Sequence, residues 1–334
     1  MFALDGRVFR ATWTVLAALG LAALVWLMRQ ALLVMVLAVL FAYVVWPLVA
    51  AAEKWFRRTR HPRLAALAVV YPILIAATAL AGTVLAPQIA EQAVTLYGKV
   101  KGFAEAAGRA RPGGALEALR DQVVAHAGEL LPYAQRAGVE VLRYVSNLWL
   151  VILVPILAFF LLKDAEELTR AVEGWFEHRE HRDLLREIFT DLHDLLAQYM
   201  RALILLSLLT FGSHGLFFLV IGAPYALLLA TLAGILEFIP MVGPLSAGAI
   251  IVLASWVAGY SHLVWIVVFL IAWRLVQDYV NMPWVLGSGV ELHPLLVIFG
   301  ILAGAEVAGV AGMFLSIPVM AAVRLLVRRA ARKA

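Results

Sequence analysis

Apolar residues occur in long, nearly uninterrupted blocks along most of this chain. The first two blocks, 11–28 and 31–52, are separated only by Arg29 and Gln30, and a third block covers 64–86. Apolar blocks of about 18 residues or more are long enough to cross a bilayer as helices, so each block predicts a membrane span. The short interval between the first two blocks predicts a tight helical hairpin.

The pattern changes in the middle of the chain. Residues 87–147 carry charges of both signs and are broken at Arg111-Pro112-Gly113-Gly114, which favours amphipathic helices outside the membrane. A span is predicted at 148–162. Residues 163–201 are the most polar part, and their apolar positions recur at the spacing of a helix face, which predicts an amphipathic cytoplasmic helix. Residues 202–221 form the next predicted span.

Two apolar segments near the C-terminus are too long to be single spans. Residues 225–257 are interrupted by Glu237–Pro244, whereas residues 295–327 have a glycine-rich centre, and an ordinary span at 262–280 lies between them. The two segments can both cross the membrane, or both can be re-entrant hairpins. The hairpin alternative makes the C-terminal region, 202–334, an inverted repeat, which is an architecture that recurs in secondary transporters.

These patterns predict an all-α polytopic membrane protein with about six full transmembrane helices and two broken or re-entrant helical hairpins. We expect five regions: N-terminal transmembrane helices at 1–86, an exterior amphipathic region at 87–147, a transmembrane helix at 148–162, a cytoplasmic amphipathic helix at 163–201 and a transport region with both hairpins at 202–334.

Composition and charge agree with this fold and add an orientation. The chain is 64% hydrophobic and 15% charged. Its net charge of +5 is concentrated in short loops, above all a basic loop at 54–63, and the chain ends in a basic tail at 324–333. Because Lys and Arg concentrate on the cytoplasmic side, we expect both termini in the cytoplasm and the protein in an inner membrane. The partner expected from this charge pattern is the lipid bilayer and not a nucleic acid.

Several classes of chemistry lack their sequence signatures. The absence of cysteine excludes a disulfide framework, a thiolate nucleophile and a cysteine-ligated metal. The chain also has no Gly-x-x-x-x-Gly-Lys-Ser/Thr loop, no Gly-x-Ser-x-Gly elbow and no His-Glu-x-x-His helix. We therefore expect no enzymatic activity, no cofactor and no metal. A gradient of an ion or of the substrate is expected to supply the energy for transport.

The breaks in the two long segments supply the candidate site. Non-helical backbone at membrane depth is tolerated only where protein or a water-filled cavity satisfies its polar groups. Each break carries a carboxylate, Glu237 or Glu306, and a charge at the bilayer centre costs about 2.5–3.5 kcal/mol. Each acid is either a coupling-ion site or a group at the membrane interface. The candidate substrate or ion path is Glu237, Pro240, Gly243, Pro244, Gly304, Glu306 and Gly309.

Four further polar residues are candidates to support this path. Arg274 and Asp278 are spaced i, i+4 on the span at 262–280 and can pair with each other, a pattern more typical of structure than of substrate binding. Asn281 and His293 flank the connection that follows, where polar turn residues at the surface are the simpler interpretation.

Several stretches resemble the autoinducer-2 exporter family of bacterial membrane proteins. They are Phe159–Asp164, Pro224–Leu227, Leu236–Pro244 with its Glu-Phe-Ile-Pro and Gly-Pro elements, Leu292–Leu295, and Gly300–Gly312 continuing to Pro318. The resemblance implies a permease-like fold, cytoplasmic termini, hairpins at both breaks and a homo-oligomer such as a pentamer. It implies export of autoinducer-2 for some members and sodium/proton exchange for others.

Three functions therefore compete. The first is a secondary transporter that exports a small polar molecule such as autoinducer-2, with Glu237 coupled to protons or sodium. The second is a cation/proton antiporter on the same scaffold, in which Glu237, Glu306 and Asp278 bind the ion. The third is a membrane scaffold or sensor without transport, in which residues 163–201 dock a partner.

Overall fold

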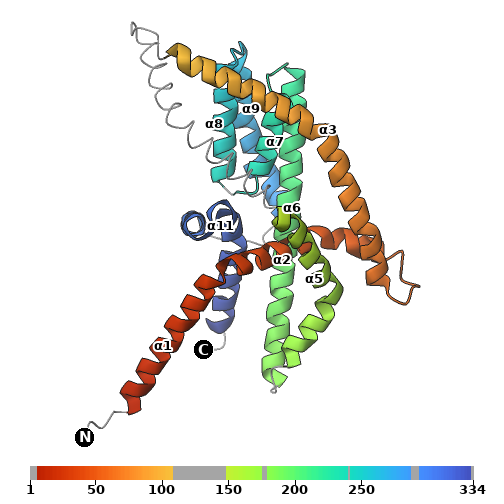
Figure 1. Cartoon of the computed structure of the whole chain (residues 1–334), viewed down its shortest axis with the longest axis vertical. Helices are drawn as coiled ribbons and strands as arrows, with labels where there is room; N and C mark the ends of the chain where they lie inside the picture. Colours follow the sequence, from red (N-terminus) through yellow and green to blue (C-terminus); the bar gives the residue numbers. More distant parts are fainter. Residues whose placement is uncertain (1–5, 108–147, 175–178, 240, 287–292, 332–334) are drawn as a thin grey trace.

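The computed structural model describes residues 6–107, 148–174, 179–239, 241–286 and 293–331, and every regular element in these ranges is helical (Figure 1). In chain order the elements are α1 (Gly6–Leu27), α2 (Arg29–Glu53), α3 (Pro62–Ala107), α5 (Leu148–Gly174), α6 (Arg179–Val220), α7 (Ala226–Leu236), α8 (Val242–Val257), α9 (Leu263–Val276), the π-helical turn η1 (Gln277–Asn281), α10 (Met282–Leu286) and α11 (Pro294–Ala331).

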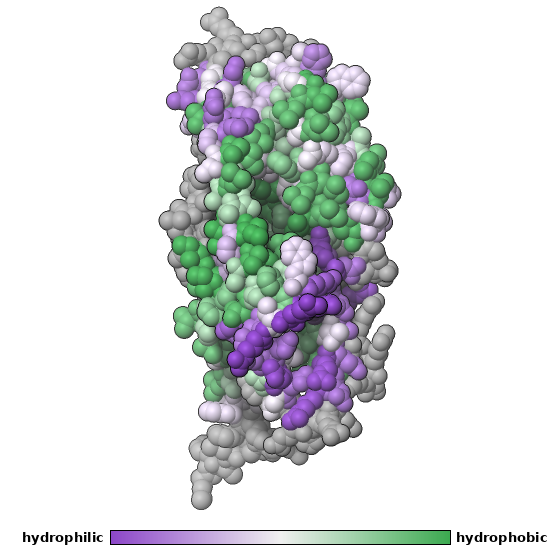
Figure 2. Space-filling view, turned by 90° about the vertical axis from the view of Figure 1, so that its right-hand side faces the viewer, coloured by the Kyte–Doolittle hydropathy of each residue, from purple (hydrophilic) through white to green (hydrophobic). Residues whose placement is uncertain are grey.

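The described helices have the lengths and surfaces of a membrane protein. Five of them are long and apolar enough to cross a bilayer, at Arg29–Glu53, Pro62–Phe103, Arg182–Val220, Leu263–Val285 and Leu295–Val327. Large apolar side chains lie exposed along them, and Figure 2 shows a broad hydrophobic surface over the middle of the molecule. Such a surface is expected where lipid, and not water, surrounds the protein. The all-α polytopic fold predicted from the sequence is confirmed.

The two N-terminal helices form a bent rod and not the tight hairpin that we predicted. The Met28 amide donates to the Leu24 carbonyl and the Leu32 amide donates to the Met28 carbonyl, both at 2.9 Å, so helical bonding continues across the junction. Figure 1 shows α1 extending away from α2. Arg29 and Gln30 are good helix formers and neither ends a helix, which is why the hairpin prediction was wrong.

The third helix continues past the boundary predicted at residue 86. It contains Pro72 and Pro87 and is bent in Figure 1, as expected where proline removes a helical hydrogen bond. Beyond the bend, the Gln92 side chain accepts a 2.9 Å hydrogen bond from the Leu228 amide at the start of α7. The part of α3 after residue 87 therefore packs on α7. The rest of the predicted exterior region, 108–147, lies outside the described residues.

The polar stretch predicted as one separate helix, 163–201, is divided between two longer helices. α5 continues beyond residue 162 to Gly174, and α6 passes residue 201 without a break. Arg186 of α6 donates two hydrogen bonds of 3.1 Å to Glu173 of α5. Figure 2 shows hydrophilic side chains gathered toward the end of the molecule where α5 and α6 meet. The helical backbone of both helices thus continues through the positions where side-chain polarity changes.

The first long segment forms a hairpin of α7 and α8, which we call the first hairpin. α7 has 11 residues, so it is about 16 Å long and cannot cross a hydrocarbon core of about 30 Å. A Cβ on Gly243 would overlap the Leu236 carbonyl, so glycine allows α8 to start against the end of α7. Ser207 of α6 donates a 2.7 Å hydrogen bond to the Gly234 carbonyl and fixes α7 on α6.

The second long segment, α11, is also folded back on itself, and we call it the second hairpin. Its backbone leaves the helical region at Ala308 and Gly309, where φ of Gly309 is 59°, a value that glycine adopts without a steric penalty. A Cβ on Gly304 would overlap the Gly312 carbonyl, and the reverse also holds. Gly304 therefore serves close packing of the two arms. The hairpin alternative is confirmed for both segments.

The two hairpins meet beside α6. The ring centre of Phe238, at the tip of the first hairpin, lies 5.9 Å from that of Phe314 in the second. Both rings pack against a cluster that includes Leu40 of α2 and Leu203 of α6. The tip of the first hairpin is thus held between α6 and the second hairpin, and this contact fixes the position of Glu237.

Candidate functional site

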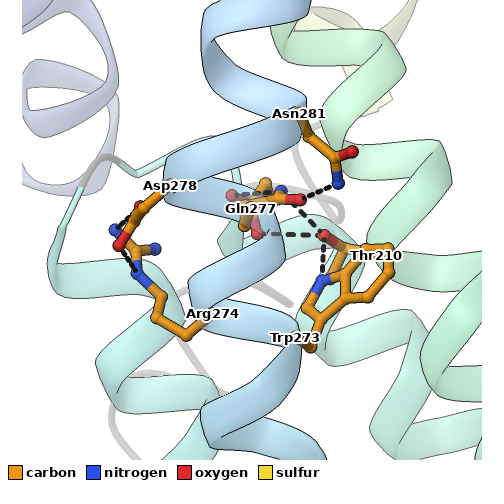
Figure 3. A network of polar contacts seen from close by, with 7 residues as sticks. Thr210, Trp273, Arg274, Gln277, Asp278 and Asn281 are labelled. Atoms are coloured by element: carbon orange, nitrogen blue, oxygen red, sulfur yellow. Dashed lines mark hydrogen bonds and ion pairs between the residues drawn. The ribbon is translucent and has the colours of Figure 1, made fainter.

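Five polar side chains meet where the tip of the first hairpin contacts α6 and α9, and we call them the Glu237 network. The Thr210 hydroxyl donates to Glu237 Oε2 at 3.2 Å and accepts from Trp273 Nε1 at 3.3 Å and Gln277 Nε2 at 3.1 Å. Gln277 Nε2 also donates to Glu237 Oε1 at 3.1 Å. Asn281 Nδ2 donates to Gln277 Oε1 at 2.8 Å. Figure 3 shows Thr210 at the centre of these contacts.

The π-helical turn at the end of α9 brings two of these amides together. Gln277 and Asn281 are the first and last residues of η1, and single π-turns inside helices are frequent at functional sites. Gln277 is 3% exposed and Thr210 is 2% exposed. Buried polar groups are normally hydrogen-bonded, and both protons and the oxygen of the Gln277 amide have partners here.

The hydrogen-bond pattern makes both carboxyl oxygens of Glu237 acceptors. The Thr210 hydroxyl has one proton and two lone pairs, and its three bonds use all of them. Gln277 Nε2 can only donate, so the Glu237 oxygen that faces it must accept. Each Glu237 oxygen accepts one hydrogen bond and keeps a further lone pair, to which a proton or a cation can bind. A bound proton or metal cation would neutralise Glu237 and thereby weaken the contacts that hold the hairpin tip, because hydrogen bonds to a charged carboxylate are stronger than those to a neutral carboxyl group.

The predicted pair of Arg274 and Asp278 forms on the other side of α9, as Figure 3 shows. Arg274 Nε donates to Asp278 Oδ2 at 2.9 Å, and a second guanidinium nitrogen lies 2.7 Å from Oδ1. Glu237 and Arg274 line the same pocket, so two carboxylates, those of Asp278 and Glu237, lie near the single guanidinium of Arg274. When all are ionised, this group of side chains carries one net negative charge at the first-hairpin tip.

A pocket of about 820 Å³ opens beside the network. Its walls are α8 and α9, and Glu237, Arg274, Gln277 and His214 are its polar lining residues apart from Trp side chains. His214 is 3% exposed and its Nδ1 donates to the Thr210 carbonyl at 2.9 Å, because a carbonyl can only accept. The pocket therefore joins the charged hairpin tip to an apolar cleft of the size that binds small molecules.

The structure brings together some of the sequence-predicted residues and not others. Glu237 and Asn281 lie in the network, Pro244 and Arg274 line the pocket, and Gly243 packs at the hairpin tip. Glu306 has an exposed side chain in the second hairpin and makes no hydrogen bond or ion pair within the described part of the chain. The remaining candidates are Gly304 and Gly309, which shape the second hairpin, and His293, whose Nδ1 accepts from the Leu295 amide at 3.2 Å at the start of α11. Pro240 lies outside the described residues.

Sequence reasoning missed Thr210, His214, Trp273 and Gln277. Polar residues inside apolar spans are rare and usually face the protein interior or a cavity, so Thr210 and Gln277 carried a usable signal. A polar residue in an apolar span indicates a candidate position but does not identify the residue that it contacts. The pairing of α6 with the tip of the first hairpin follows from tertiary packing, which the pattern of one segment does not reveal.

Comparison with known protein families identifies the family to which this chain belongs. A family profile described as "AI-2E family transporter" matches residues 15–332. The chain belongs to the AI-2E transporter family. This agrees with the resemblance that the sequence motifs carry, and together with the apolar helices it identifies a multi-pass membrane protein of a transporter family.

Curated relatives of this AI-2E family chain are named as transport proteins. "Putative transport protein YrrI" of Bacillus subtilis is 26% identical over 174 residues, which are 52% of this chain and 49% of that protein. "Putative transport protein MT0215" of Mycobacterium tuberculosis is 36% identical over 124 residues, 37% of this chain and 34% of that protein. "Putative permease PerM" of Escherichia coli K12 is 26% identical over 179 residues, 53% of this chain and 50% of that protein. The matched part of this chain spans about half the length of most of these relatives.

Proposed function

We propose that this protein is a secondary transporter that exports a small molecule with a polar group, with Glu237 as the site that couples export to protons or sodium. Family membership and the names of the relatives support a role in membrane transport. The coupling role is based on the position of the Glu237 carboxylate. It accepts hydrogen bonds from Thr210 and Gln277 at the tip of the first hairpin, and it lines the adjacent pocket.

The geometry suggests how a cation at Glu237 would act on the hairpin. Without the cation, both carboxylate oxygens accept hydrogen bonds, one from α6 and one from the end of α9. A cation or proton neutralises the carboxylate, and hydrogen bonds to a neutralised carboxyl group are weaker, so binding weakens the link between the hairpin tip and these helices. The hairpin then changes its position relative to α6, and the pocket changes its access. Glu237 thereby links cation binding to substrate movement.

The remaining parts of the proposal follow the charge pattern and the family resemblance. Autoinducer-2 is the first molecule to test as cargo, because it is small and polar and matches the hydrogen-bonding end of the pocket. The protein would lie in the bacterial inner membrane with both termini in the cytoplasm, as its basic loop at 54–63 and basic tail suggest. Its assembled form would be a homo-oligomer of five copies, as the family resemblance implies.

The test is flux in vesicles that contain purified protein. An imposed proton or sodium gradient should drive autoinducer-2 movement in the wild type, and Glu237→Gln should abolish the coupled flux because the neutral amide takes up no proton and lacks the negative charge that attracts sodium. Glu91→Gln, which changes an exposed carboxylate on α3, is the matched control and should keep the flux. Full coupled flux in Glu237→Gln would refute the coupling role. No flux of any kind in the wild type would refute transport itself.

A second function is favoured by one observation, the net negative charge of Glu237, Arg274 and Asp278 beside the pocket. A negative site attracts a cation even without an organic cargo, as a cation/proton antiporter requires. Proton flux that depends on sodium and needs no added cargo would establish this alternative. The same Glu237→Gln variant should abolish that flux.

A further inference from the structure

The pocket beside the first hairpin is apolar along most of its length. Residues from Leu245 to Trp256 of α8 form one wall, which at the rise of a helix corresponds to about 16 Å. Leu263, Val267 and Ile271 of α9 lie on the facing wall. A wholly polar cargo would lose its hydration against these walls and gain no hydrogen bonds in return. A polar molecule therefore accounts for only one end of the pocket.

The charged groups gather at that one end. Glu237 is at the hairpin tip, Arg274 and Gln277 are at the C-terminal end of α9, and all three line the pocket. Arg274 is already paired with Asp278, so the surplus charge at this end is the negative charge of Glu237. In surroundings of low polarity an uncompensated charge attracts an opposite charge more strongly than it does in water.

The rim of the pocket is apolar and exposed. Leu245 is 72% exposed, Ile271 is 59% exposed and Val267 is 36% exposed. α9 belongs to a segment, Leu263–Val285, that is long and apolar enough to cross a bilayer, and α8 is a shorter apolar helix. Exposed apolar side chains on such helices are expected to contact lipid, which places the mouth of the pocket at the hydrocarbon of the bilayer. A molecule dissolved in one leaflet could enter the pocket sideways without crossing water.

We infer that the pocket binds an amphiphilic cation, with the positively charged head at Glu237 and a single apolar tail between α8 and α9. The inference rests on the proposed function, because it names the chemical class of the cargo. A lipid acyl chain or a helix from a second copy of this chain would match the apolar walls equally well. Either of these occupants would leave the negative charge of Glu237 uncompensated, which is why the structure favours the cation.

Binding of four small probes to the full chain in nanodiscs of zwitterionic lipid tests the inference. Octyltrimethylammonium has both the head and the tail, tetramethylammonium has only the head, octanol has only the tail, and octyl sulfate has a tail with a head of the opposite charge. Octyltrimethylammonium should bind at least about tenfold more tightly than each of the others, a difference that corresponds to about 1.4 kcal/mol.

Two matched variants localise the binding. Ala249 lines the pocket on α8, whereas the next residue, Ile250, does not, and both are exposed. Ala249→Trp should fill the cleft and weaken octyltrimethylammonium binding by about tenfold or more, and Ile250→Trp should leave it unchanged. Glu237→Gln should remove the preference for octyltrimethylammonium over octanol while tail binding remains. Loss of binding in both tryptophan variants would contradict a pocket site.

The other occupants give different results. Equal binding of octanol, octyl sulfate and octyltrimethylammonium would identify a groove for lipid tails and overturn the inference. Because the chain has no cysteine, Ala249→Cys can form a disulfide only with a second copy, and it reports a contact in which the pockets of two copies face each other. Disulfide formation between copies, with no probe binding, would identify the pocket as a subunit interface and also overturn it.

Flux in vesicles separates this inference from the proposed function. Gradient-driven movement of octyltrimethylammonium, lost in Ala249→Trp and kept in Ile250→Trp, supports both. Gradient-driven flux of another cargo without octyltrimethylammonium binding overturns the inference and leaves the proposed function intact. Selective binding without any coupled flux overturns the proposed function, and with it the cargo role, while the specificity of the pocket stands.

Discussion

The two hairpins of this protein have the same outline and different chemistry. Each interrupts a long apolar segment, and each has a glutamate near its turn. In the first hairpin, Glu237 accepts hydrogen bonds from Thr210 and Gln277 and lines a pocket. In the second, glycines 304 and 312 bring the arms together, and Glu306 is exposed without a partner in the described region.

The comparison shows that a carboxylate at a break does not by itself define a site. What distinguishes Glu237 is the set of donors that two other helices supply. The second hairpin contributes differently, since its Phe314 packs against Phe238 at the tip of the first. We conclude that the first hairpin carries the chemistry and that the second supports its position.

The largest expected effect comes from removing the hub of the network. Thr210→Val keeps the shape of the side chain but leaves Glu237, Trp273 and Gln277 each with one hydrogen bond fewer. Each unsatisfied buried group costs about 1–3 kcal/mol, so thermal unfolding in detergent should show a clear loss of stability, and coupled flux should fall sharply. The matched control is Thr231→Val in α7, because the Thr231 hydroxyl is buried without a partner in the described part of the chain. That variant should be neutral or more stable, and equal losses in both variants would argue against the network.

A smaller effect is expected from the glycine contact that closes the second hairpin. Gly312→Ala adds a Cβ that overlaps the Gly304 carbonyl, and overpacking of this kind costs about 1–3 kcal/mol. Gly98→Ala in α3, where nothing lies within 4 Å of the added Cβ, should instead stabilise the helix by about 0.5–1 kcal/mol. Thermal unfolding of the two variants measures both changes. Opposite shifts support the folded-back geometry of α11, whereas a stabilising Gly312→Ala would contradict it.

The smallest effect is expected at the second acid. Glu306→Gln changes an exposed side chain without a described partner, and such changes usually alter stability by less than about 0.5 kcal/mol. Gradient-driven flux in vesicles should therefore remain close to that of the wild type. If Glu306→Gln abolished flux as completely as Glu237→Gln, both hairpins would contribute acids to one path, and the contrast between them would be lost.

The sequence predicted the fold class, the two hairpins and the position of Glu237, because each of these features can be recognised from the residues of a single segment. The length of an apolar segment and an interruption in its middle indicate a hairpin. An acid in an apolar run indicates a side chain whose charge is costly to place in the membrane. The bend at Met28 was not predicted because the short polar interval has no turn residue to indicate its geometry. The partners of Glu237 were not predicted because Thr210 and Gln277 reach it only after α6, α7 and α9 have packed together.

The central claim is that a cation at Glu237 releases the tip of the first hairpin alone. In this cysteine-free chain, single cysteines at Met241→Cys and Val307→Cys place one exposed thiol on each hairpin tip. The measurement is the rate of maleimide labelling of each thiol in nanodiscs, with and without sodium at constant pH. Sodium should speed labelling of Met241→Cys, leave Val307→Cys unchanged and have no effect on Met241→Cys once Glu237→Gln is added. Labelling of Met241→Cys that, relative to Val307→Cys, responds neither to sodium nor to a lower pH, or an equal acceleration at both tips, would contradict the account.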